Sequence, residues 1–171
     1  MRALHRPLIL GCLIVLAGLV LVPLGADAAS RYSTPPPLAL PTCAAGQLRL
    51  DKIGGQGFTG HREWDFALRN VSSHTCKLSG FPGVKLLDKN AKPFGVSVIH
   101  HGSTGGLLVL HTWQRAKFKF VYTDKGPCIP HFFTAYGLRV TPPGTTGGLV
   151  FYAGSFGVCN FGHPTVSAVT P

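Results

Sequence analysis

Carboxylates are scarce in this sequence, which has 6 Asp and Glu residues against 16 Lys and Arg residues. Glycosidase-type acid–base chemistry needs two carboxyl groups at one site. Glu63 and Asp65 share one face of a predicted strand, but Arg62 and Arg69 stand beside them, which favours a solvated surface with ordinary ion pairs. A paired-carboxylate active site is therefore not expected.

Motifs for metal binding are also missing. Met1 is the sole methionine, which excludes a Cu(I) site built on methionine, and no Cys-x-x-Cys or His-x-His pair occurs. His100 and His101 are adjacent, so in a strand their rings point to opposite faces. Because either could meet His111 across two strands joined by a glycine-rich loop, a histidine-based metal-binding protein is the alternative function. No metal ligand or cofactor is assigned.

The chain lacks a nucleophile motif and a helix to present one. The resemblance of residues 153–157 to a nucleophile elbow is only loose, since Ala153 occupies a position where that motif has glycine. After residue 28, no segment keeps a 3.6-residue apolar period long enough for a helix. The sequence therefore predicts a protein that is not an enzyme, and a small secreted hydrolase is the least favoured class.

The N-terminus has the pattern of an export signal. Two arginines precede an uncharged apolar run over residues 8–22, and Ala26 and Ala28 supply the small residues of a cleavage site. The alternative is an uncleaved anchor, because the run approaches the roughly 20 residues that span a bilayer. Pro23 favours cleavage, since it breaks the helix beside that site.

Three regions are predicted: a signal peptide at residues 1–28, a proline-rich leader at 29–42 and one domain at 43–171. After cleavage no transmembrane segment is expected, and the protein is secreted, extracellular or held in the cell envelope. The formal net charge is +10, and residues 1–28 contribute little of it. Such a charge favours an anionic cell-wall polymer, a lipid headgroup or another envelope protein as partner, with no specific nucleic-acid binding expected.

Cysteines predict two disulfide bonds. Cys12 leaves with the signal peptide, and an even number in an exported domain indicates a disulfide framework. Four cysteines allow three connectivities. The midpoints of consecutive pairs fall on the turn sequences 57–60 and 142–144, which favours linking consecutive cysteines. The predicted disulfide bonds therefore join Cys43 to Cys76 and Cys128 to Cys159.

Hydrophobic residues recur with a period of two. Trp64, Phe66 and Leu68 face one side of a segment whose other side is charged, as in a half-buried strand. Turn sequences at 54–55, 81–83, 102–106, 126–127 and 142–144 separate nearly all strand candidates. Seven to nine short strands favour an all-β, immunoglobulin-like antiparallel β-sandwich. The other candidates are 48–53, 84–87, 94–98, 107–110, 117–122, 136–140, 149–152 and 165–169.

The clearest surface feature is a basic stripe. Arg115, Lys117 and Lys119 recur at the strand period, opposite Phe118 and Phe120. A solvated strand face is the common explanation of such a pattern. The functional hypothesis is that the stripe contacts a linear polyanion.

Residues 70–84 carry a family resemblance. A strand ending in Asn70 is followed by the pattern Cys76-x-Leu78-x-Gly80-aromatic-Pro-x-Val. This block closely resembles the actinobacterial secreted family of domains of unknown function numbered 4232 (DUF4232), and the match extends over about 43–170. The resemblance implies an exported, often envelope-associated β-sandwich with no assigned activity and no catalytic residues to carry over. The block also has a structural interpretation, in which Cys76 is bridged, Leu78 fills the core and residues 80–83 turn the chain.

Overall fold

The computed structural model describes residues 39–124, 128, 132–159 and 163–171. The predicted signal peptide and most of the predicted leader lie outside the described residues. The compact unit spans Leu38–Pro171. Its elements are η1 (Ala45–Gln47), β1 (Leu48–Phe58), β2 (His61–Asn70), β3 (Cys76–Leu78), β4 (Gly83–Leu87), β5 (Ile99–His101), β6 (Leu108–Leu110), β7 (Arg115–Thr123), β8 (Phe132–Thr141), β9 (Leu149–Cys159) and β10 (Thr165–Ser167).

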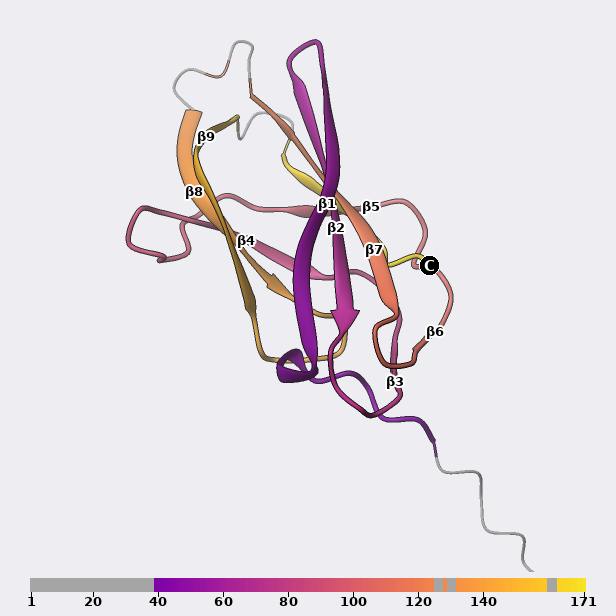
Figure 1. The fold of residues 1–171 in the computed structure, drawn as a ribbon. Helices are drawn as coiled ribbons and strands as arrows, with labels where there is room; N and C mark the ends of the chain where they lie inside the picture. The colour runs from indigo at the N-terminus through magenta and orange to yellow at the C-terminus, as the bar shows by residue number, and fades with distance from the viewer. Residues whose placement is uncertain (1–38, 125–127, 129–131, 160–162) are drawn as a thin grey trace, which may run out of the picture. The chain divides into compact units, whose positions relative to one another are not determined.

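The strands form two groups that enclose the core. In the first, β1 pairs with β2 and β2 with β7, while β10 lies between β7 and β5. In the second, β8 pairs with both β4 and β9. Both groups are visible in Figure 1. A register contact between Thr123 and Cys159 joins β7 to β9, and β3 and β6 form a separate small sheet. The core fills with inward side chains of both groups, including Phe66, Phe120 and Leu138.

The expected immunoglobulin-like antiparallel β-sandwich is confirmed. The described residues form ten strands, of which β3, β5, β6 and β10 have three residues each. All strand pairs are antiparallel except β5 with β10, which is parallel. Two of these short strands, β3 and β5, were not predicted, which explains why ten are present where the sequence favours seven to nine.

Gly54 and Gly55 do not form the expected turn. Strand β1 continues through them to Phe58, with a β-bulge between Lys52 and Gly54. A Cβ at Gly55 would lie 2.7 Å from the Glu63 carbonyl oxygen, so the glycine permits close approach of β2 rather than a reversal. The chain reverses instead between Phe58 and His61.

The predicted strand at 94–98 is also wrong. Its alternation of apolar residues reflects burial, since Val96 lies in the core and Phe94 and Val98 pack against it. Its backbone bonds are local ones, because Phe94 N–H donates to the Leu86 carbonyl and Val96 N–H to the Phe94 carbonyl. The next strand, β5, begins one residue after this segment.

Both predicted disulfides are confirmed. Cys43 is bonded to Cys76 with 4.9 Å between their Cα atoms, and Cys128 to Cys159 with 5.3 Å. The first pair spans the β1–β2 hairpin, and the second pair spans the β8–β9 hairpin. Each pair of consecutive cysteines therefore closes one hairpin, as the turn sequences at their midpoints predict.

The family block begins with a buried asparagine at the end of β2. Asn70 is fully buried, and its amide nitrogen donates to the carbonyls of His74 and Leu110 over 2.8 and 3.0 Å. Its side-chain oxygen accepts bonds from the N–H and the hydroxyl of Ser72. Asn70 thus joins the turn before β3 to strand β6 with every polar atom of its side chain satisfied.

The rest of the block has the expected structural role. Leu78 is buried, and Gly80 adopts a left-handed conformation with φ +92°, which glycine allows without strain. The Gly80 carbonyl accepts a bond from Val169 N–H near the C-terminus. The Phe81 ring stacks on His100 with 4.4 Å between centroids. These residues connect β3, β4 and the C-terminal segment.

Tyr122 links the aromatic core to alkaline stability. Burial is the main cause that raises its pKa to about 12, and Asp124 adds to the shift. An unfolded tyrosine ionises near pH 10, so between pH 10 and 12 the unfolded state loses this proton while the folded state keeps it. Stability should therefore fall as the pH rises through this window. In Tyr122→Phe, denaturant unfolding measured from pH 9 to 12 should show a shallower decline.

The exposed Tyr152→Phe change is the control for that experiment. An identical decline in the wild type and in Tyr122→Phe would show that other groups govern alkaline unfolding.

Candidate functional site

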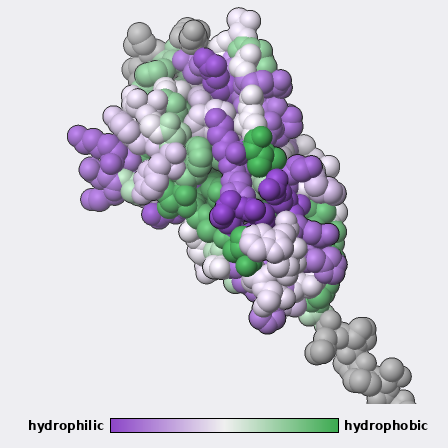
Figure 2. Space-filling view, viewed as in Figure 1, coloured by the Kyte–Doolittle hydropathy of each residue, from purple (hydrophilic) through white to green (hydrophobic). Residues whose placement is uncertain are grey.

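The outer face of β7 carries the predicted basic stripe. Arg115, Lys117 and Lys119 are exposed, and the alternate residues, including Phe118 and Phe120, are buried in the core. This is the alternation that the sequence predicts. In Figure 2, hydrophilic side chains over β1 and β2 surround isolated hydrophobic ones.

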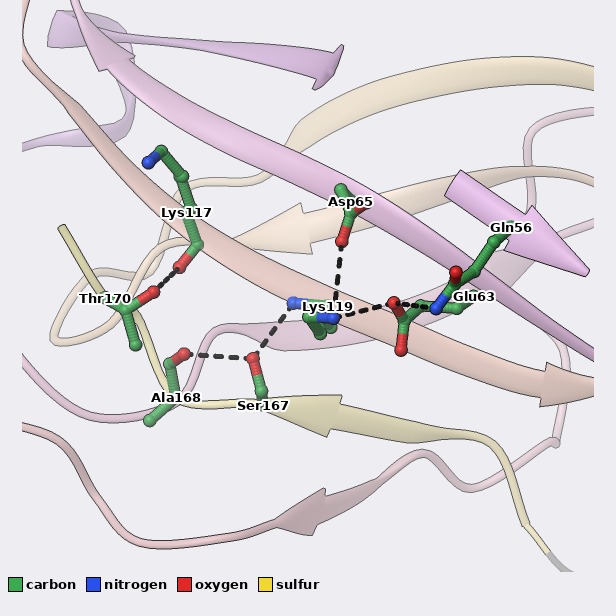
Figure 3. Close-up of polar contacts among 8 residues, drawn as sticks. All are labelled: Gln56, Glu63, Asp65, Lys117, Lys119, Ser167, Ala168 and Thr170. Carbon is green, nitrogen blue, oxygen red and sulfur yellow. Dashed lines mark hydrogen bonds and ion pairs between the residues drawn. The ribbon is translucent and has the colours of Figure 1, made fainter. Parts of the chain in front are cut away.

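Lys119 is neutralised by neighbouring carboxylates. Its Nζ donates to Glu63 Oε1 over 2.7 Å and lies 3.9 Å from Asp65 Oδ1, and both acids belong to β2. Gln56 Nε2 donates to the same Glu63 oxygen over 3.1 Å, so the carboxylate is held from both sides (Figure 3). The hydrogen bond to Glu63 raises the pKa of Lys119 above its ordinary value. The positive charge at this end of the stripe is thus compensated.

Arg115 and Lys117 differ from Lys119. Among the described residues, neither forms an ion pair with a carboxylate. Across the β2–β7 ladder Lys117 faces Ala67, and Arg115 faces Arg69, which is already paired with Asp51. In Figure 3 the Lys117 ammonium group points away from the cluster around Lys119. The stripe therefore consists of one compensated cation and two uncompensated ones.

A hollow of about 530 Å³ adjoins the stripe where β10 separates from β7. The two strands pair up to Val166, after which Ser167 Oγ accepts a bond from Lys119 N–H over 2.9 Å. The segment after β10 meets β7 again at Thr170, whose carbonyl accepts a bond from Lys117 N–H and whose N–H donates to the Lys117 carbonyl. The lining residues are Ile53, Asp65, Lys117, Phe118, Lys119, Ser167 and Thr170.

The two hydroxyl groups at the hollow have hydrogen-bond partners within the protein. The Ser167 hydroxyl donates to the Ala168 carbonyl, and the Thr170 hydroxyl donates to the Lys117 carbonyl (Figure 3). These two hydroxyl protons are therefore held by carbonyl oxygens. What the hollow offers to a partner is the charge of the lysines and Asp65 at its edge, beside the apolar surface of Ile53.

The ion pairs on this side differ from those expected. Glu63 and Asp65 are not paired with Arg62 and Arg69. Arg62 pairs with Asp124, which raises the pKa of the arginine, and Arg69 pairs with Asp51 over 3.1 Å. These partners come from β1 and from the residue after β7, which sequence proximity does not reveal. Ser167 and Thr170 were also not predicted, because strand separation leaves no pattern in the sequence.

The histidines considered as metal ligands belong to segments that do not pair with each other. His100 and His101 belong to β5, which pairs with β10, whereas His111 follows β6, which pairs with β3. β5 and β6 are therefore not the adjacent strands across which His111 could meet His100 or His101. His111 Nδ1 instead lies 3.0 Å from the Thr75 hydroxyl. In the described part of the chain, no three His, Cys, Asp or Glu side chains are grouped to hold a metal ion.

Two further observations concern the location of the protein. Two disulfide bonds are compatible with an extracellular protein. Within the ranges that the structure describes, no helix has the length and apolar character needed to cross a membrane.

Comparison with known proteins identifies one family. A model of a domain of unknown function, DUF4232, matches residues 43–170, which is the whole disulfide-bonded sandwich. No curated protein and no solved structure matches the chain.

Proposed function

Since the chain belongs to the DUF4232 family, whose function is unknown, we propose that it is a non-enzymatic binding domain of the cell envelope or extracellular space. It contacts an anionic polymer through the outer face of β7. The observation that carries this proposal is the pair of cations, Arg115 and Lys117, that form no ion pair among the described residues. Lys117 also lines the hollow at β10. A row of cations along an extended strand matches the repeating charges of a linear polyanion.

The salt dependence of binding distinguishes this electrostatic contact from non-specific hydrophobic adsorption. A cation that neutralises a phosphate releases a counterion, so each contact steepens the dependence of affinity on salt. Replacing Arg115 and Lys117 with serine should reduce the slope of log affinity against log salt for polyphosphate by about 1.4, with the coefficient for single strands. Fluorescence titration with polyphosphate at a series of salt concentrations measures the slope.

Lys119→Ser is the matched control on the same strand. Because Glu63 and Asp65 already compensate this lysine, its replacement should leave the slope nearly unchanged. All three residues are exposed, so the free energy of unfolding should change little in either variant. Equal slopes in the wild type and the Arg115→Ser/Lys117→Ser variant would contradict the proposal.

A lipid headgroup and another envelope protein are the two alternative partners for the same cations. Vesicles with and without phosphatidylglycerol test the first partner, and capture from an envelope fraction tests the second. Binding to anionic vesicles without binding to polyphosphate would replace the polymer by a membrane surface as the partner of β7.

A further inference from the structure

The outer face of β4, β8 and β9 contains two cations directly opposite each other. Lys85 on β4 pairs in register with Arg139 on β8. Both side chains point outward, because the alternate residues, among them Leu86 and Leu138, are fully buried. Cβ atoms at such positions lie about 4.5–5.5 Å apart, and like charges placed there destabilise a sheet. The pair needs an explanation beyond the fold.

The carboxylates that form ion pairs lie elsewhere in the described structure. Asp51, Glu63 and Asp65 are on β1 and β2, and Asp124 follows β7. Asp88, which follows β4, accepts the N–H groups of its own turn. Among the described residues, no carboxylate pairs with Lys85 or Arg139. The two charges therefore repel each other without a counterion from these parts of the protein.

Strand β9 places exposed apolar side chains beside the two cations. Val150, opposite Arg139, is 40% exposed, and Tyr152, opposite Gly137, is 68% exposed. The residue beside Tyr152 is Gly137, which has no side chain. A larger residue does not fit there, because its Cβ would lie 2.5 Å from the Phe151 carbonyl oxygen. This face therefore offers two cations next to an open aromatic surface.

We propose that this face binds an anionic glycan. One sulfate, phosphate or carboxylate group lies between Lys85 and Arg139, and an adjoining sugar ring packs against Tyr152. An anion placed there compensates both cations, and the guanidinium group of Arg139 can donate two parallel hydrogen bonds to it. Tyr152 supplies one exposed ring close to these cations. This favours a glycan over single-stranded nucleic acid, which stacks successive bases on several aromatic side chains. This site does not depend on the proposed site at β7.

Thermal stability tests the repulsion without a polymer. Lys85→Gln should raise the melting temperature by about 2 °C at low salt, because it removes the unfavourable pair. Sodium sulfate should then stabilise the wild type more than the variant. The matched control is Lys77→Gln on β3, where the cross-strand neighbour is Val109 and no repulsion is relieved. A lower melting temperature in Lys85→Gln, or equal changes in both variants, would overturn the inference.

Binding to defined polymers tests the occupant. Dextran sulfate combines anions with sugar rings, polyphosphate has anions alone, and neutral dextran has rings alone. The Lys85→Gln/Arg139→Gln variant should bind dextran sulfate about tenfold more weakly, as expected for two exposed charges. Tyr152→Ala should weaken the binding of dextran sulfate severalfold and leave the affinity for polyphosphate unchanged.

Each contrary outcome has a definite meaning. Equal weakening of both polymers by Tyr152→Ala would overturn the sugar contact, and tighter binding of oligothymidylate than of dextran sulfate would make the partner a nucleic acid. Unchanged affinity in the Lys85→Gln/Arg139→Gln variant overturns this site. If Arg115→Ser/Lys117→Ser then still loses polyphosphate binding, the proposal for β7 stands alone.

Discussion

Replacing Asn70 with alanine should lower the free energy of unfolding by about 3 kcal/mol, because several buried or partly buried polar groups lose their partners together. The Asn70 side chain donates to the carbonyls of His74 and Leu110 and accepts two bonds from Ser72. Removing it leaves two carbonyls and one N–H without these bonds, of which the bond to Leu110 is buried and those to His74 and Ser72 N–H are partly buried. Urea denaturation followed by tryptophan fluorescence measures the loss.

Two variants show whether the network or the residue type is responsible. Asn90→Ala, in the exposed turn after β4, removes an asparagine side chain that accepts no bond in the described structure and should change stability by less than about 0.5 kcal/mol. Ser72→Ala removes one of the four bonds and should fall between the two. A loss below 1 kcal/mol in Asn70→Ala would mean that water replaces the network at small cost.

The second large effect concerns the first disulfide bond. The Cys43→Ala/Cys76→Ala variant should lose about 4 kcal/mol of stability, because the bond closes a loop between cysteines 33 positions apart in the sequence. Both cysteines are fully buried and belong to the hydrophobic core, so their removal also loses packing. Chemical denaturation without reducing agent, compared with the wild type, gives the difference.

The other disulfide is a control with nearly the same loop length. Cys128 and Cys159 are separated by 31 residues, so chain entropy alone predicts an almost equal loss for Cys128→Ala/Cys159→Ala. Both are buried, at 3% exposed, but neither packs into the main core cluster, and the loss should therefore be the smaller of the two. A larger loss in this second variant would show that burial at Cys43 and Cys76 contributes nothing.

Features encoded locally could be predicted from the sequence. The alternation of charged and aromatic residues in β7 identifies its two faces, because successive side chains of a strand point in opposite directions. Turn sequences midway between consecutive cysteines identify the disulfide pairs, because a hairpin brings residues equidistant from its turn together. Both features depend on neighbours in the sequence or on one hairpin.

Features that depend on distant partners could not be predicted. Whether Lys119 is free depends on Glu63, which lies 56 positions earlier in the sequence and reaches it through the β2–β7 ladder. The hollow beside it depends on where β10 leaves β7, and the facing of Lys85 and Arg139 depends on the β4–β8 register. A basic stripe in the sequence therefore says which residues are exposed, whereas the fold decides which of them still carry an uncompensated charge.

The pairing of the C-terminal residues affects when the protein can fold. Val169 bonds to Gly80, and Thr170 bonds to Lys117, so the last residues complete contacts with segments made much earlier. β10 also supplies the strand that holds β5 in place. During synthesis the sandwich cannot close until residues 165–170 emerge, and contacts so distant in sequence favour slow folding. Until then β5 and the outer edge of β7 are unpaired, and a chaperone would find its binding surface there.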